Sequence, residues 1–203
     1  MDDSKIAEGE IMQGQAFLDL LHTLYACEEA TDWVSANIHQ DLKWLWENCT
    51  RSDWMLWLLW ELDDGEHDRY LEFARECAQA AVPIWEQHAS EEDKSLARDL
   101  MATGKTARGT SAWSAWLEYR AQQGGTYGEL SDFPVHIHAL RAVLQIAPTR
   151  MYPQADSVVG SAEFAGVPCS DMLRARFPFS VLYNEMQGYL VRQREEDDYA
   201  YSG

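Results

Sequence analysis

The longest uninterrupted apolar stretch of the chain is Trp54-Met55-Leu56-Trp57-Leu58-Leu59-Trp60. Thr50 and Asp53 stand just ahead of it with the spacing of a helix capping box, so a helix is expected through the run. A helix that is apolar on every side is expected to lie centrally among its neighbours. Since a membrane-spanning helix needs roughly 20 apolar residues, the sequence predicts no membrane segment.

Helical periodicity continues on both sides of this run. Further helices are expected at about 4–36, 40–48, 66–87, 91–102, 111–122, 135–146, 170–176 and 179–194. Pro83 falls inside one of them and predicts a kink or a break. Residues 148–168 are rich in Pro, Gly and Ser and show no regular period, so they are expected to be irregular. The sequence therefore predicts an all-α, single-domain bundle of seven to nine helices over residues 1–203, with an irregular segment near 148–168.

Negative charge is concentrated in the first half of the chain. Residues 1–100 carry 23 Asp and Glu against 7 Lys and Arg, which accounts for −16 of the net −18. The same half holds seven of the nine tryptophans, so we distinguish a strongly acidic, Trp-rich half (1–104) from a near-neutral half (105–203) with an acidic tail. Such charge repels nucleic-acid phosphates and anionic membranes. It favours a basic protein or nucleoprotein partner and argues against direct nucleic-acid binding.

Four cysteines are widely spaced and form no C-x-x-C pair: Cys27, Cys49, Cys77 and Cys169. Three of them fall inside apolar helical patterns, where a free thiol packs as a small hydrophobic side chain. No signal peptide is recognisable at the N-terminus. The sequence therefore predicts a cytoplasmic protein with reduced thiols.

Three motifs in residues 26–82 give the chain a resemblance to a known family. They are Ala26-Cys27-x-x-Ala30-x-x-Trp33, Trp46-x-x-Cys49-x-Arg51-x-Asp53-Trp54-x-x-Trp57-Leu58-Leu59 and Arg75-Glu76-Cys77-Ala78. This part of the chain resembles bacterial and bacteriophage proteins that are often labelled immunity proteins or left uncharacterised. The resemblance implies a helical scaffold in a bacterial or phage-infected host cell. It transfers no catalytic residue, and residues 105–203 do not share it.

No recognised catalytic, cofactor or metal motif is complete. Gly104-Lys105-Thr106 is similar to the end of a phosphate-binding loop, but Asp99 stands where that loop needs a glycine. His136 and His138 would share a metal ion only on a strand, because on the expected helix they point about 200° apart. We therefore expect no catalytic residue, no cofactor and no metal. An enzyme with a composite site around these two histidines is kept as a third interpretation.

A row of carboxylates is the strongest functional candidate. Its members recur at i, i+4 and would lie about 6 Å apart along one helix face. The row consists of Asp64, Asp68, Glu72 and Glu76, and Glu28, Glu29 and Asp32 add charge to the same half. At that pitch the row roughly imitates a nucleic-acid backbone and would suit a basic groove on a nuclease or DNA-binding complex. The alternative is a solvated helix face that only keeps the protein soluble.

The tryptophans divide into core and contact candidates. Trp54, Trp57 and Trp60 are expected in the core. Trp44 is expected to be partly exposed, because Leu45 and Trp46 occupy the side of the helix that faces the core. An aromatic among carboxylates has the composition of an interface hot spot, so Trp44 is the first choice of contact residue.

Together these features predict a non-enzymatic acidic inhibitor of a basic protein partner. Immunity proteins against toxins and phage proteins that block host defence belong to this class. The alternative function is a structural or assembly scaffold whose charge serves solubility alone. A homo-oligomer is left open.

Overall fold

The computed structural model describes residues 12–65, 67–88, 91, 94–95, 135–146 and 155–200. This part of the chain contains nine helices and no strand, which confirms the all-α class. The helix expected at 111–122 and most of the one at 91–102 lie outside the described residues. Contacts divide the chain into two compact units: unit 1 comprises 1–66 with 172–203, and unit 2 comprises 67–171. The change in composition near residue 104 is therefore not a unit boundary, and a single domain over 1–203 stays a prediction.

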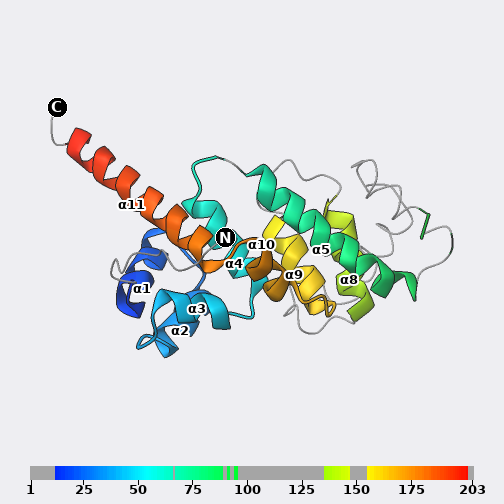
Figure 1. Ribbon diagram of the computed structural model, residues 1–203. Coiled ribbons are helices and arrows are strands. Elements are labelled where there is room, and N and C mark those ends of the chain that lie inside the picture. The colour runs from blue at the N-terminus through cyan, green and yellow to red at the C-terminus, as the bar shows by residue number, and fades with distance from the viewer. Residues whose placement is uncertain are drawn as a thin grey trace. The chain divides into compact units, whose positions relative to one another are not determined.

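Unit 1 joins the first helices of the chain to the last one (Figure 1). Its helices are α1 (Gly14–Thr23), α2 (Glu28–Ala36), α3 (Leu42–Asn48), α4 (Ser52–Leu62) and α11 (Phe179–Ala200). α1 packs on α2, and α11 contacts both α3 and α4. The last helix is longer than expected, because it continues through the acidic tail to Ala200.

The single helix predicted over 4–36 is wrong, because a turn separates α1 from α2. Tyr25 has a φ of 58°, a left-handed conformation that L residues adopt at a cost. Its N–H donates to His22 O at 3.2 Å, and that of Ala26 donates to Leu21 O at 2.9 Å. These are the two hydrogen bonds of a helix-ending turn that usually has glycine at the left-handed position. Because tyrosine stands where glycine is usual, the sequence does not indicate that the helix ends here.

α1 begins where two backbone segments approach closely. The N–H of Leu42 donates to Met12 O at 3.1 Å, and Gln13 forms an isolated bridge with Asp41. A Cβ on Gly14 would overlap the carbonyl oxygen of Ile38 and lie 2.8 Å from its carbonyl carbon. This position therefore requires glycine.

The start of α4 differs from the predicted capping box. Arg51, not Thr50, is the N-cap residue, and its side chain makes no capping bond. Asp53 is engaged by that same arginine, which donates to its two carboxylate oxygens at 2.9 and 2.6 Å. The carboxylate therefore forms a bidentate ion pair instead of a helix cap.

α4 is also less central than its composition predicts. Its buried positions are Ser52, Met55, Leu56, Leu58, Leu59 and Leu62. Trp54, Trp57 and Trp60 are only half-buried, so the expectation that they lie fully in the core is wrong. Residues at i, i+3 and i+6 share one side of a helix. In α4 the leucines fill the core, and the bulkier tryptophans share the partly exposed side.

Two arginines from the end of the chain hold helix ends within unit 1. Arg174, on α10 (Cys169–Arg176), donates to Cys49 O at 2.7 Å and to Trp46 O at 3.4 Å. Arg192 of α11 donates to Leu62 O at 2.6 Å. The last carbonyls of a helix have no partner within it, so cations are favourable there. These bonds bind the C-terminal segment to the ends of α3 and α4.

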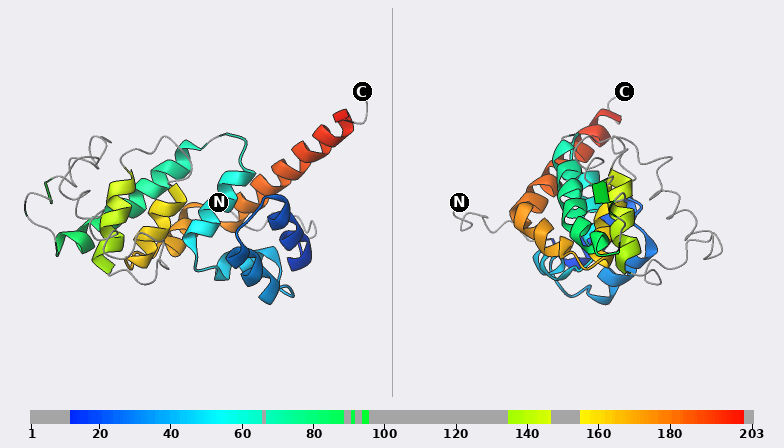
Figure 2. Two further views of the ribbon diagram at one scale, coloured as in Figure 1. Left: turned by 180° about the vertical axis from the view of Figure 1, so that it is seen from behind. Right: turned by 90° about the vertical axis from the view of Figure 1, so that its right-hand side faces the viewer.

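Unit 2 is built around three described helices that pack on one another (Figure 2). They are α5 (Asp68–Glu86), α8 (Val135–Ile146) and α9 (Ala155–Phe164). α8 has the predicted bounds, and α5 continues through Pro83 to its end at Glu86.

The irregular segment predicted near 148–168 is helical over the range of α9, which corrects that expectation. Residues at every angle around α9 are buried, namely Ala155, Val158, Val159, Gly160, Ser161 and Ala162. An amphipathic period arises only when one side of a helix faces water. A helix of small residues that is covered on most sides has no such period, so the sequence does not reveal it.

Candidate functional site

Aromatic and aliphatic side chains of unit 1 enclose an apolar pocket. Its cavity volume is about 50 Å³. Its lining consists of Phe17, Leu21, Ala30, Trp33, Val34, Leu42, Leu45, Trp46, Cys49, Trp54, Met55, Trp57, Leu58 and Leu182. Hollows lined mainly by aromatic and aliphatic side chains are typical of binding sites.

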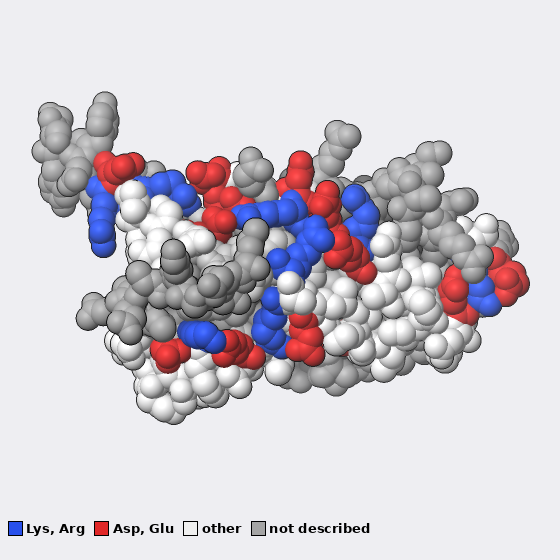
Figure 3. All heavy atoms as spheres, viewed as in Figure 1, with Lys and Arg blue, Asp and Glu red and all other residues white. Residues whose placement is uncertain are grey.

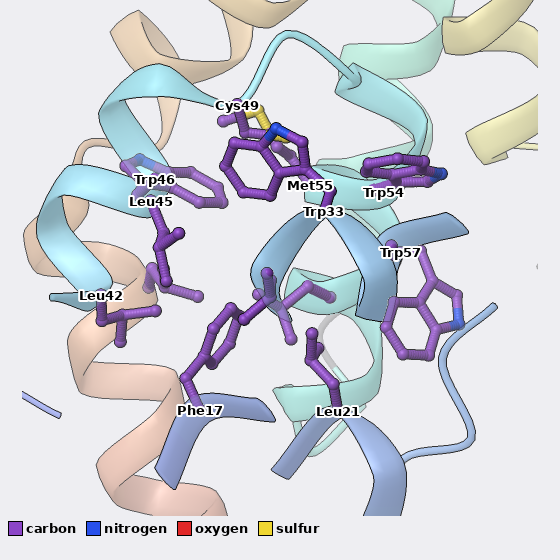
Figure 4. Close-up of a pocket in the computed structure, with 14 residues that line it drawn as sticks. Phe17, Leu21, Trp33, Leu42, Leu45, Trp46, Cys49, Trp54, Met55 and Trp57 are labelled. Atoms are coloured by element: carbon purple, nitrogen blue, oxygen red, sulfur yellow. The ribbon is translucent and has the colours of Figure 1, made fainter. Parts of the chain in front are cut away.

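The tryptophans of the pocket come from three different helices (Figure 4). Trp33 of α2 lies opposite the side chains that rise from α1, with Trp46 of α3 on one side and Trp54 and Trp57 of α4 on the other. Trp46 is buried, whereas the other three are half-buried. The pocket therefore presents partly exposed indole rings at its margin.

The α2 helix that helps to line this pocket also carries carboxylates. Glu28, Glu29 and Asp32 are all exposed, and none forms an ion pair within the described part of the chain. Glu29 stands four residues before Trp33, so the two side chains are neighbours on the helix surface, whereas Glu28 and Asp32 are two residues from the pocket-lining Ala30 and lie on the other side of α2. The predicted contact residues of α2 thus share a helix with a tryptophan that lines the pocket.

Arg51 is the cation at the edge of the pocket. Its guanidinium lies 4.3 Å from the ring centroid of Trp54, a cation–π contact, and pairs with Asp53. The hydrogen bond to Asp53 raises the pKa of Arg51 above its ordinary value, and the charge of Glu29 adds to the rise. This arginine is already held by a carboxylate and by an aromatic face, so it adds little positive charge to the margin.

The predicted row of four carboxylates is divided in the structure. Asp64 lies outside α5, which begins at Asp68, and it belongs to unit 1. Its Oδ2 atom lies 3.7 Å from Nη1 of Arg192. Asp68, Glu72 and Glu76 remain together on α5 in unit 2, and all three are exposed. The single helix face of four carboxylates is therefore wrong, and three of them form the observed row.

Trp44 is half-buried, as predicted, and the following Leu45 and Trp46 are buried. It does not line the pocket. The aromatic that combines pocket lining with neighbouring carboxylates is Trp33, which sequence analysis missed. The i, i+3, i+4 spacing of Glu29, Asp32 and Trp33 was the signal that could have found it.

The acidic side chains do not form one continuous surface on the face in Figure 3. There the described Asp and Glu side chains stand among Lys and Arg side chains. Part of this mixing is local pairing, such as Lys43 with Glu47 and Lys94 with Glu91.

The histidine candidates are not assembled into a described site. His138 is buried and stacks on Phe164, with ring centroids 5.2 Å apart, whereas the side chain of His136 lies outside the described residues. Among the described residues, no group of three or more His, Cys, Asp or Glu is placed to hold a metal ion. None of the described helices combines the length and the apolar character needed to cross a bilayer.

Two buried cysteines of unit 2 are neighbours. A hydrogen bond with Cys77 and burial raise the pKa of the Cys169 thiol above its ordinary value. Both side chains are fully buried. A thiol that is inaccessible and resists ionisation is a poor nucleophile, so this pair serves packing.

Comparison with known proteins returns no counterpart. No family model matches the chain, and no curated protein or solved structure is significantly similar to it.

Proposed function

We propose that this protein is a non-enzymatic inhibitor that binds a basic protein or nucleoprotein, such as a nuclease, a toxin or a phage-defence complex. The observation that carries the proposal is the group of exposed carboxylates Glu28, Glu29 and Asp32 on α2, of which Glu29 stands one helical turn before the pocket-lining Trp33. Interfaces of this kind combine charged residues at the rim with aromatic anchors at the centre.

The two parts of this surface have different roles. Exposed carboxylates attract a cationic partner over distances up to a Debye length and so raise the association rate. Half-buried tryptophans lose their remaining contact with water when the partner covers them, which lowers the dissociation rate. Asp68, Glu72 and Glu76 on α5 are the second candidate contact, and α5 contributes no residue to the lining of this pocket.

Capture from a bacterial lysate tests this proposal. The immobilised protein is expected to retain a basic protein at about 50 mM salt and to release it near about 500 mM, because screening weakens exposed charge pairs. The captured protein is then assayed for nuclease or toxin activity with and without the purified inhibitor.

A matched pair of variants separates inhibitor from scaffold. Substituting Glu28→Gln, Glu29→Gln and Asp32→Asn should abolish capture if the α2 carboxylates recognise the partner. A scaffold whose charge serves only solubility would retain the same proteins after this change. Retention of no basic protein by the unmodified chain would contradict the proposed function.

A further inference from the structure

The pocket of unit 1 is shaped for an apolar group and not for a polar one. Its lining side chains are aliphatic, aromatic or sulfur-containing, and they come from α1, α2, α3, α4 and α11. A polar group placed there would lose its hydration without gaining a hydrogen bond. The occupant therefore has to bring a large apolar side chain to the pocket.

The net charge of residues 12–65 indicates which kind of group would lie next to the inserted apolar side chain. Residues 12–65 carry 10 Asp and Glu against 2 Lys and Arg, a net charge of −8. Both cations are paired, Lys43 with Glu47 and Arg51 with Asp53. Glu29 stands one helical turn before the pocket-lining Trp33 and forms no ion pair among the described residues, so a carboxylate lies beside the pocket wall. A cationic group beside the apolar one would complement this margin.

The same charge argues against other occupants. A second copy of this chain would bring an equally acidic surface to the pocket, and like charges in an interface cost free energy. An anionic membrane would be repelled for the same reason. A basic segment of another protein satisfies both the apolar pocket and the acidic margin.

The backbone N–H and C=O groups of that segment are best hydrogen-bonded to one another, within the segment. The described part of unit 1 contains helices and one isolated bridge, so it offers no strand edge to an extended peptide. An amphipathic helix needs no such edge, because its own hydrogen bonds are internal and its apolar face can enter a groove.

We propose that the pocket of unit 1 docks a basic amphipathic helix of the partner, with one large apolar side chain inserted between Trp33, Trp54 and Trp57. A lysine or arginine side chain one helical turn from the anchor would lie against Glu29 of α2. This inference rests on the proposed function and specifies the partner surface that the inhibitor recognises.

Three synthetic peptides provide the probes. The first is a fluorescein-labelled helix of about 18 residues, or about five turns, with leucine on one face and lysine on the other. In the second peptide glutamate replaces lysine, and in the third alanine replaces leucine. Fluorescence anisotropy is expected to show that the leucine–lysine peptide binds at least about tenfold more tightly than either of the other two. Equal affinity for the alanine–lysine peptide would overturn the proposal, since it would mean that charge acts without the pocket.

Variants of the protein locate the binding site. Trp33→Ala removes part of the pocket wall, and Ala30→Leu places extra atoms in the pocket. Each is expected to weaken binding of the leucine–lysine peptide at least about tenfold, whereas Trp44→Ala, which changes a half-buried tryptophan away from the pocket, should alter it less than about twofold. Circular dichroism confirms that each variant is folded. Unchanged affinity in a folded Ala30→Leu variant would overturn the inference.

Failure of the inference and failure of the proposed function give different results. If Ala30→Leu still captures the basic protein from lysate, the docking proposal is wrong and the inhibitor proposal stands. If the unmodified protein captures no basic protein but binds the leucine–lysine peptide in the pocket, the docking chemistry stands and the proposed function is wrong.

Discussion

The two units bury their helices in different ways. Unit 2 completely buries small side chains on α5 and α8, including Ala78, Ala139 and Ala142, together with two rings of α5, Tyr70 and Phe73. Unit 1 uses leucines and tryptophans, and three of its tryptophans remain half-buried around a pocket. Small side chains let helix backbones approach and close the space between them, whereas bulky rings from several helices leave space between their edges. We therefore place the proposed binding surface on unit 1, where half-buried tryptophans border a pocket.

Enlarging a buried alanine in each unit is the strongest test of this contrast. Ala142→Leu in unit 2 is expected to lower the free energy of unfolding by about 3 kcal/mol, because the extra atoms have no space. Ala30→Leu in unit 1 should change it by less than about 1 kcal/mol, since its side chain extends into the pocket. Urea denaturation measures both. Equal losses in the two variants would contradict the difference in packing.

Gly14 tests whether unit 1 is loosely packed everywhere. Gly14→Ala should lower the free energy of unfolding by about 2 kcal/mol, because the new methyl group meets the backbone of Ile38. The matched control is Ala16→Gly at an exposed position of α1, which should cost about 1 kcal/mol through helix propensity alone. A Gly14→Ala variant as stable as the unmodified protein would show that α1 can shift away from Ile38.

Arg174 tests whether the end of the chain stabilises unit 1. Arg174→Ala leaves Cys49 O and Trp46 O without these donors and should cost about 1.5 kcal/mol. Arg194→Ala, at an exposed position of α11, is the control and should stay within about 0.5 kcal/mol. Thermal unfolding followed by circular dichroism compares the two. An equal effect of both substitutions would mean that the carbonyl contacts contribute nothing specific.

Substitution of Tyr25 is expected to change the free energy of unfolding least, and to raise it where the other substitutions lower it. Tyr25→Gly relieves the left-handed conformation and should raise the free energy of unfolding by about 1 kcal/mol. Thr23→Gly, inside the last turn of α1, should lower it by about 0.4 kcal/mol. Urea midpoints of the two variants measure the signs. Destabilisation by Tyr25→Gly would show that the exposed ring makes a stabilising contact.

Sequence reasoning found the elements with a strong amphipathic period and missed those decided by three-dimensional context. The bounds of α8 follow from its apolar spacing, and the inward positions of Leu45 and Trp46 follow from theirs. α9 was missed because it is covered on most sides, and the end of α1 because Tyr25 stands where glycine is usual. Composition gave the charge of the first half, but it could not show that Asp64 leaves the row on α5 or that Trp33 lines a pocket.

The most direct measurement of the central claim compares two variants that lose the same charge. One carries Glu28→Gln, Glu29→Gln and Asp32→Asn on α2, and the other carries Asp68→Asn, Glu72→Gln and Glu76→Gln on α5. Stopped-flow association with the leucine–lysine peptide at low salt should slow about tenfold for the α2 variant and less than about twofold for the α5 variant. Equal slowing in both would contradict the account, because total charge, and not the margin of the pocket, would then govern recognition.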